Sequence, residues 1–321
     1  MKVVRVTRFG GPEVLVAGEA PEPAAGPGQV VVAVAVAEIN FVETQLRRGI
    51  TPGPPLPEPP YVPGGGVAGR VAAIGDGVAP EWLGRRVTTG TAGRLGGNAE
   101  RAVADVDDLV PVPDGLDLAE AAALLHDGGT ALGLFDGAGV RAGDRVLVEA
   151  AAGGLGSLLV QLALSAGARV VGAARGEAKL ALVRELGAEA VDYSEPGWAK
   201  RVLDATGGFD VVFDGVGGEI GREAFGATAR GGRFSVHGAS AGAATVIPPE
   251  EAAERGVTVF GIEQLMGFGD GAKERVRRAL DAAAAGRIRP VIGRRLPLER
   301  AADAHAAMEA RSVVGKTLLV V

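Results

Sequence analysis

Cysteine is absent from the 321 residues of this chain. The sequence therefore excludes disulfide bonds, cysteine-ligated zinc, iron–sulfur clusters and thiol nucleophiles. Histidine is scarce as well: only three are present, and His126, His237 and His305 lie too far apart to show the spacing of metal ligands. We therefore expect no metal site.

Long apolar runs and blocks of basic residues are missing too. The most apolar stretch, residues 158–171, is interrupted by polar residues and is too short to span a bilayer. The first residues, MKVVRVTRFGG, lack the apolar segment of a signal peptide and predict a strand. The net charge of −6, without any basic block, argues against nucleic acid as the main partner. We expect a soluble cytoplasmic protein without membrane insertion.

Apolar residues, by contrast, make up 47% of the chain, which is ordinary for a globular protein. Up to about residue 115, short apolar runs separated by glycine and proline predict β-structure, and the proline-dense segment 51–66 predicts an exposed loop. Asp117 and Glu120 fit a capping box that opens a helix. From about residue 144, strands alternate with helices, which predicts an α/β fold with a doubly wound parallel sheet. The expected strands are 146–148, 170–173, 209–213 and 233–236, and the expected helices are 158–166, 179–186 and 272–285.

The segment AAAGGLG, residues 150–156, lies between an expected strand and an expected helix. Against the dinucleotide template GxGxxG, its three key positions hold Ala151, Gly153 and Gly156, so the first glycine is missing. Gly153 would let the backbone approach a pyrophosphate, and Gly156 would let helix and strand pack closely. Tight packing alone is the alternative interpretation, but the strand–helix units around the loop favour cofactor binding.

The end of the second strand of this alternating region indicates which cofactor is bound. NAD enzymes place an acidic residue there to bind the ribose 2′-hydroxyl. This chain has Ala173 and Ala174, followed by Arg175 and Lys179, and this combination favours the 2′-phosphate of NADP(H). Glu177 is the nearest acid, and we expect it to lie past the pocket on the helix. The alternative is that the two basic residues are ordinary solvated charges.

Three segments together resemble the medium-chain dehydrogenase/reductase superfamily, and within it the zinc-independent quinone oxidoreductases. They are the glycine loop near residue 150, EINFVETQLRRG (38–49) and KLALVRELGAEAVDY (179–193). The resemblance covers residues 1–321. It implies a GroES-like, β-rich catalytic domain (1–122, completed by 293–321) and a Rossmann NADP-binding domain (123–292). It also implies a homodimer that pairs Rossmann edge strands, here VTVFGIE (257–263).

The resemblance further implies roles for individual residues. Asn40 would lie near the nicotinamide and hydrogen-bond a substrate carbonyl, and Glu43 replaces a usual aspartate beside it. Thr130 would lie on the nicotinamide side of NADPH. The other implied cofactor contacts are Ala152, Gly153, Gly154, Leu155 and Gly156 at the pyrophosphate, Arg175, Lys179 and Tyr193 around the 2′-phosphate, His237, Gly238, Ser240, Phe260 and Ile262 near the nicotinamide or ribose, and Lys316.

The chain also departs from that pattern. Two tyrosines common near the substrate in related quinone reductases are replaced by Gln45 and Thr51. Tyr61, in the proline-rich segment, could serve instead as a catalytic residue, and a merely exposed side chain is the alternative. A relay between His126 and Asp127 is disfavoured, because consecutive residues of a helix do not face one another.

We predict an NADPH-dependent, zinc-independent reductase that transfers a hydride to quinones. A reduced quinone oxygen can take its proton from water, so Asn40 could stabilise the developing charge without a strong acid. The alternative is a reductase of the double bond of 2-alkenals or enoyl thioesters, whose carbon must be protonated. A third possibility, from another class, is a catalytically inactive NADPH-binding structural or regulatory protein.

Overall fold

The computed structural model describes residues 1–51 and 55–321, so residues 52–54 of the predicted proline-rich loop lie outside the described residues. The chain divides into two compact units. The first contains Met1–His126, Val276–Gly286 and Ile292–Val321, and the second contains Asp127–Arg275 and Arg287–Val291. The segment 276–286 therefore belongs to the first unit, whereas the sequence prediction placed it in the Rossmann domain.

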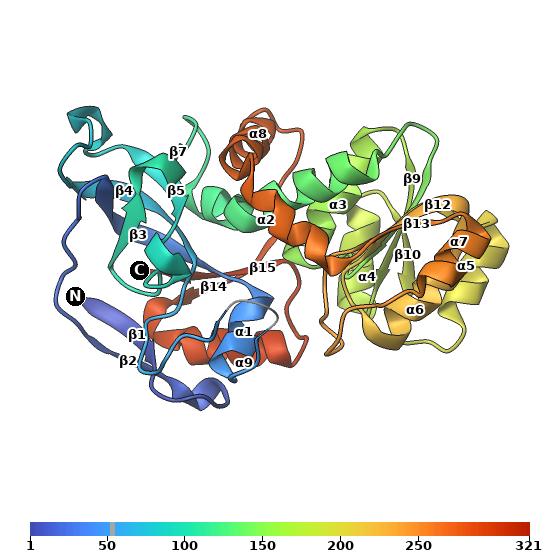
Figure 1. Cartoon of the computed structure of the whole chain (residues 1–321), viewed down its shortest axis with the longest axis horizontal. Coiled ribbons are helices and arrows are strands. Elements are labelled where there is room, and N and C mark those ends of the chain that lie inside the picture. The colour runs from blue at the N-terminus through green and yellow to red at the C-terminus, as the bar shows by residue number, and fades with distance from the viewer. Residues whose placement is uncertain (52–54) are drawn as a thin grey trace. The chain divides into compact units, whose positions relative to one another are not determined.

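The first unit is built on a seven-stranded sheet with the order β14-β15-β3-β4-β5-β7, in which β6 also pairs with β3 (Figure 1). β15 lies antiparallel to β3, with Thr317 opposite Ile39, so the end of the chain completes the N-terminal sheet. Alternating valines of β3 supply much of the core of this unit. The strands are β3 (Gln29–Ile39), β4 (Gly66–Ile74), β5 (Arg86–Gly90), β6 (Arg101–Asp105), β7 (Val110–Pro111), β14 (Ile292–Pro297) and β15 (Lys316–Val320), and β1 (Lys2–Val6) pairs separately with β2 (Leu15–Glu19).

Two short helices of the first unit are tied together by a buried ion pair. The guanidinium of Arg47, at the end of α1 (Phe41–Arg47), is fully buried and contacts the carboxylate of Glu309 in α9 (Ala301–Glu309). A buried cation needs such a partner, so the pair holds α1 and the residue that begins it, Asn40, in place.

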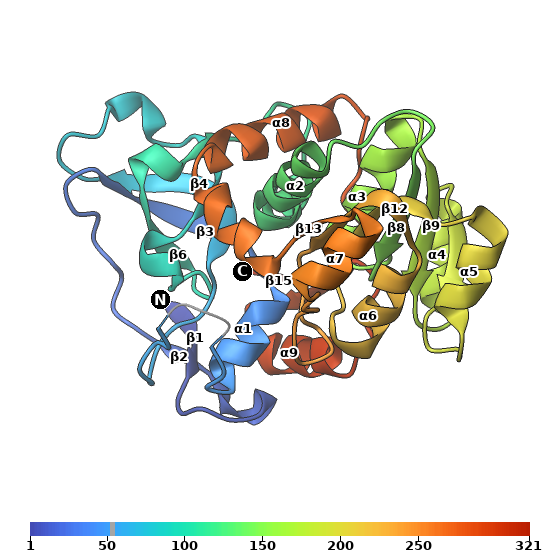
Figure 2. The ribbon, with the colours of Figure 1, turned by 45° about the vertical axis from the view of Figure 1, so that its right-hand side comes forward.

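The second unit is a six-stranded, all-parallel sheet with the order β10-β9-β8-β11-β12-β13, which is the strand order of a Rossmann fold. Helices that connect the strands pack against the sheet (Figure 2). The strands are β8 (Arg145–Glu149), β9 (Arg169–Ala174), β10 (Glu189–Asp192), β11 (Phe209–Asp214), β12 (Thr228–Val236) and β13 (Thr258–Phe260), and the helices are α3 (Gly154–Ser165), α4 (Glu177–Glu185), α5 (Trp198–Thr206), α6 (Gly218–Gly226) and α7 (Pro249–Arg255).

The sequence prediction missed β10 and counted Phe209–Phe213 as the third strand of this region. The strand has only four residues, and none of them is fully buried, so it lacks the apolar run that identifies a central parallel strand. A β-strand at the edge of the sheet does not need that run.

Two longer helices complete the fold. α2 (Leu118–Ala138) opens on the predicted capping box, which is confirmed: the backbone N–H of Asp117 donates to Glu120 Oε2 at 3.0 Å. α8 (Ala272–Ala284) lies where the sequence predicted a helix. Within residues 1–51 and 55–321, no helix is both long and apolar enough to cross a membrane.

Candidate active site

Most of the predicted cofactor residues of the Rossmann unit lie at the carboxyl ends of its parallel strands. The glycine loop follows β8, Arg175 follows β9, Tyr193 follows β10, and Phe260 ends β13. His237, Gly238 and Ser240 follow β12, Ile262 follows β13, and Thr130 lies on α2. The carboxyl ends of parallel strands are where doubly wound sheets bind nucleotides. The fold therefore brings together strand ends that are far apart in the chain, from residue 150 to residue 262.

The turn between β8 and α3 is tighter than the template predicted. Ala150, one residue before the predicted first position, carries the left-handed conformation with φ 51°, and the N–H of Gly153 donates to its carbonyl at 2.8 Å. A Cβ on Gly156 would lie 2.3 Å from that carbonyl oxygen, so no side chain fits there. Gly153, Gly154 and Leu155 remain partly accessible at the start of α3, and the N–H groups of Gly154 and Leu155 can bind an anion there.

The region after β9 carries the basic residues predicted for the 2′-phosphate. Arg175 is exposed, and its guanidinium lies 5.8 Å from the centre of the Tyr193 ring. Lys179 is half-buried on the first turn of α4. Glu177 pairs with Arg184 at 2.6 Å, so its carboxylate is engaged along the helix as expected.

Asp192 is an acid that the sequence prediction missed at this edge, because it ends the unrecognised strand β10. Its carboxylate accepts hydrogen bonds from the N–H groups of Gly176 and Ser194 at 2.9 and 2.8 Å. Burial alone would raise the pKa of Asp192, but the hydrogen bonds from Ser194 and Gly176, with the charge of Arg175, lower it. Asp192 therefore stays ionised and holds the loop that presents Arg175.

Two further acids, Glu149 and Asp214, are fully buried at the carboxyl ends of β8 and β11. Burial and the neighbouring charge of Asp214 raise the pKa of Glu149 well above its usual value. Asp214 accepts hydrogen bonds from the N–H groups of Val216 and Gly217. Burial lowers the pKa of the adjacent His237 to about 4 although Asp214 opposes this, so the imidazole is neutral.

In the first unit, Asn40 sits between β3 and α1 and contacts the C-terminal strand. Its backbone N–H donates to Glu43 Oε1 at 3.1 Å, which caps the helix. Its side-chain Oδ1 accepts a hydrogen bond from the ammonium of Lys316 at 2.6 Å. Because the ammonium can only donate, the carboxamide must present Oδ1 to Lys316, which leaves its Nδ2 group as a donor.

Lys316 belongs to a buried polar cluster that the sequence prediction did not foresee. Its ammonium lies 2.7 Å from Glu38 Oε2, and the other carboxylate oxygen of Glu38 contacts His126 Nδ1. Burial opposes ionisation of Glu38, but the charges of Lys316 and His126 lower its pKa to about 2. A Cβ on Gly66 would lie 2.3 Å from Glu38 Oε1, so that glycine makes room for the contact. The ammonium of Lys316 thus has partners inside the first unit, and its predicted cofactor contact stays a prediction.

Tyr61 is not the exposed loop residue of the alternative interpretation. It is half-buried against the core of the first unit, and its backbone forms a bridge with Val6, whose N–H donates to the Tyr61 carbonyl at 2.8 Å. Burial and the neighbouring charge of Glu43 raise the pKa of its phenol to about 12, although Arg47 opposes this. The phenol is therefore neutral, and its catalytic role stays a prediction.

Glu43 gives the first unit a distinct dependence on pH. Burial and the charge of Glu38 raise its pKa to about 7, from the usual 4.5, against the hydrogen bond from Asn40. Because the folded protein holds this proton more tightly than the unfolded chain, the stabilisation is complete below pH 4.5 and is lost as pH rises through 7. A Glu43→Gln variant keeps the cap without the titration. We expect its free energy of unfolding, relative to wild type, to rise by about 3 kcal/mol over that window in urea melts. A constant difference between the two proteins would contradict this assignment.

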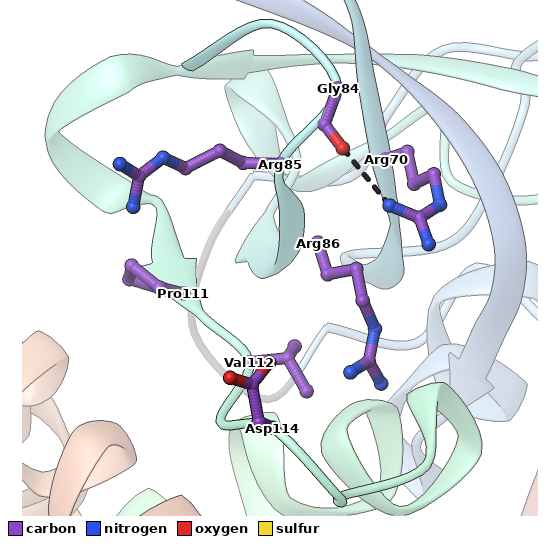
Figure 3. A pocket seen from close by; sticks show the side chains of 7 residues that line it. All are labelled: Arg70, Gly84, Arg85, Arg86, Pro111, Val112 and Asp114. Carbon is purple, nitrogen blue, oxygen red and sulfur yellow. Dashed lines mark hydrogen bonds between the residues drawn. The ribbon is translucent and has the colours of Figure 1, made fainter. Parts of the chain in front are cut away.

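The first unit also has a pocket of about 300 Å³ that is lined by three arginines and contains none of the predicted site residues (Figure 3). Its guanidinium groups already donate to backbone carbonyls: Arg70 to Gly84, Arg85 to Glu81 and Arg86 to Leu116. Asp114 adds a negative charge to the lining. These guanidinium groups therefore already bind the backbone of the first unit.

Comparison with known proteins finds a matching family model for each of the two domain types. Residues 26–114 match the family model of the alcohol dehydrogenase GroES-like domain, and residues 154–285 match that of zinc-binding dehydrogenases. The quinone oxidoreductase of Rattus norvegicus is 32% identical over 304 residues, which cover 93% of this chain and 91% of the relative. The chain belongs to the medium-chain dehydrogenase/reductase superfamily.

Other members of the superfamily differ in their named activities. A 2-haloacrylate reductase of a Burkholderia species is 34% identical over 248 residues, which cover 75% of this chain and 74% of the relative. The structure of Escherichia coli quinone oxidoreductase complexed with NADPH matches with a TM-score of 0.91 and 26% identity, over the full length of both chains. Although the second family model is named for zinc, the residues described in this member of the superfamily form no group of three or more histidine, aspartate or glutamate side chains placed to hold a metal.

Proposed function

We propose that this protein is an NADPH-dependent oxidoreductase that transfers a hydride to a quinone without zinc. The observation that carries the proposal is the carboxamide of Asn40, which Lys316 holds through Oδ1, so that Nδ2 would be the donor to the substrate. A neutral donor fixed in advance stabilises the negative charge that develops on a carbonyl oxygen during reduction. Cysteine, needed for the usual zinc ligands, is absent from the chain.

The Rossmann unit fits the dinucleotide, which supplies the hydride when bound. Gly153, Gly154 and Leu155 would bind the pyrophosphate through the open start of α3, where Gly156 lets the backbone turn closely. Arg175 and Lys179 would bind the 2′-phosphate, with Tyr193 beside them. The neutral His237 would lie near the nicotinamide or ribose without adding a charge. The relative solved with NADPH supports this cofactor.

A second class of hydride acceptor also has support. The relationship to a 2-haloacrylate reductase favours, as second candidate, reduction of a carbon–carbon double bond conjugated to a carbonyl group. Asn40 would serve either reaction, because both pass negative charge to a carbonyl oxygen. Relatives named quinone oxidoreductase support the quinone.

Steady-state oxidation of NADPH tests the proposal. We expect turnover with 1,4-benzoquinone or a naphthoquinone to exceed, in kcat/KM, that with a 2-alkenal, an enoyl thioester or 2-chloroacrylate under the same conditions. Preference for the double-bond substrates would establish the second candidate. Tight NADPH binding without turnover of any acceptor would indicate a non-catalytic NADPH-binding protein.

Arg175→Ala and Lys179→Ala are expected each to weaken NADPH binding by about 10- to 100-fold, because each removes a charged hydrogen bond to the 2′-phosphate. Binding of NADH, which lacks that phosphate, should change little. Arg169→Ala is the matched control, because Arg169 is exposed at the opposite end of the same strand. Fluorescence titration with both cofactors measures these affinities, and equal losses for NADH and NADPH would refute the assignment.

The proposed homodimer would use the edge strand β13, which pairs only with β12 in the described part of the sheet. Its exposed side could continue the sheet into a second copy. Light scattering of the wild-type protein tests this state directly.

A further inference from the structure

Four polar side chains of the first unit form a continuous chain from the solvent to Asn40. His126 begins it, with 47% of its side chain exposed, and its Nδ1 contacts Glu38. The Glu38 side chain is fully buried, and the Lys316 side chain is only 5% exposed, at 2.7 Å from it. Lys316 then donates to Asn40 Oδ1 at 2.6 Å. Residues from β3, α2 and β15 are needed to assemble this path.

We propose that Lys316 donates the proton taken up by the acceptor oxygen bound to Asn40, and that Glu38 and His126 restore that proton from solvent. This inference rests on the proposed function. The hydride supplies both electrons of the reduction, and the acceptor oxygen then takes H⁺ from the Lys316 ammonium. Neutral Lys316 regains H⁺ from Glu38, which takes it from His126 Nδ1, and the imidazole is reprotonated by water. The products are NADP⁺ and the reduced acceptor.

Electrostatics favour the return of a proton to Lys316 along this path. The charged and titratable groups around the path are Glu38 on β3, Glu43 on α1, His126 on α2 and Lys316 on β15. While Lys316 is charged, it holds the pKa of Glu38 low, to about 2, so the carboxylate cannot trap a proton. Once Lys316 is neutral, a buried carboxylate has lost its main counter-charge, and its proton affinity rises. Glu38 therefore draws a proton from His126 only after one has been delivered.

A purely structural role would require the same buried Lys316–Glu38 pair but not its extension to solvent. The contact between Glu38 and His126 depends on Gly66, where a Cβ would lie 2.3 Å from Glu38 Oε1 and 3.1 Å from His126 Cε1. His126 is therefore the residue that distinguishes a relay from a buried structural pair. Its side chain is half in solvent, so its replacement leaves the core intact.

The test compares kcat for a quinone in three variants whose melting temperature and NADPH affinity are measured alongside. His126→Gln is expected to lower kcat about tenfold and to flatten its pH profile, with added imidazole restoring activity. Lys316→Arg keeps the charge and the fold but holds its proton too tightly, so kcat should fall by about 10² or more. Glu38→Gln should lower kcat comparably and abolish imidazole rescue.

The outcomes separate this inference from the proposed function. Wild-type kcat and an unchanged pH profile in His126→Gln, or full activity in Lys316→Arg, would overturn the relay while the quinone reductase stands. A wild-type protein that reduces no quinone or enone would overturn the proposed function itself, and the relay with it. Loss of kcat without imidazole rescue in His126→Gln would also count against the relay.

Discussion

Gly156→Val is expected to abolish NADPH binding and to lower the free energy of unfolding by up to about 3 kcal/mol. A Cβ at this position would lie 2.3 Å from the Ala150 carbonyl oxygen and 3.0 Å from the Ala151 Cα. Because both atoms belong to the backbone, no side-chain rotation relieves the clash. The start of α3 must move away from β8, and the anion-binding N–H groups move with it. Urea melts and fluorescence titration with NADPH measure the two effects.

Gly137→Ala is the matched control for this variant. Gly137 lies on α2, and a Cβ there would meet no atom within 4 Å. The alanine is expected to leave NADPH affinity unchanged and to stabilise the helix by about 0.5–1 kcal/mol. Wild-type affinity for NADPH in Gly156→Val would show that the glycine loop does not hold the cofactor.

Asn40→Ala is expected to lower kcat/KM for a quinone by about 10²–10³, the loss typical of removing one preorganised donor to a developing oxyanion. The reason is the loss of Nδ2, which Lys316 holds in position through Oδ1. Asn40→Asp is the isosteric comparison: it keeps the contact to Lys316 but replaces the donor with a charged acceptor. We expect it to be at least as impaired as the alanine variant.

The two substitutions at Asn40 are read from steady-state kinetics at saturating NADPH, with urea melts to confirm folding. If Asn40→Asp retained most of the wild-type kcat/KM, the carboxamide would not be the donor. If Asn40→Ala alone retained it, the stabilisation of the oxyanion would have to come from another group of the first unit, with Tyr61 the next to be replaced.

Local signals predicted most of the fold. The capping box of Asp117 and Glu120, the alternating strands and helices, and the glycines after β8 each reflect interactions between residues close in sequence, and a pattern can record these. The sequence prediction was wrong where the local pattern was weak or lay one residue away from the template position. β10 is short and only partly buried, and the left-handed turn falls on Ala150, where the template would place it at Ala151. Asp192 was missed because it is the last residue of β10, the strand that the sequence prediction did not recognise.

Some residues of the candidate site could be located from the sequence, whereas the surroundings of others could not. Arg175 and the glycine loop could be located from the sequence because each follows a strand that its own apolar residues reveal. Asn40 was located through the resemblance to the zinc-independent quinone oxidoreductases. Tyr61 was placed in an exposed loop because the prolines around it indicate a turn. The burial of its ring depends on a bridge to Val6, a residue 55 positions earlier, and no local pattern records that.

The sequence by itself determined the α/β class and the Rossmann unit, because periodicity and turn residues act over short distances along the chain, and its resemblance to known proteins indicated the superfamily. Only the tertiary structure decided how Asn40 is held and what lies behind it. His126 contacts Glu38 on β3, and Lys316 reaches both Glu38 and Asn40 because β15 pairs with β3. The physical reason is that buried charges must find partners wherever the sheet brings them, and pairing across a sheet leaves no regular spacing in the sequence.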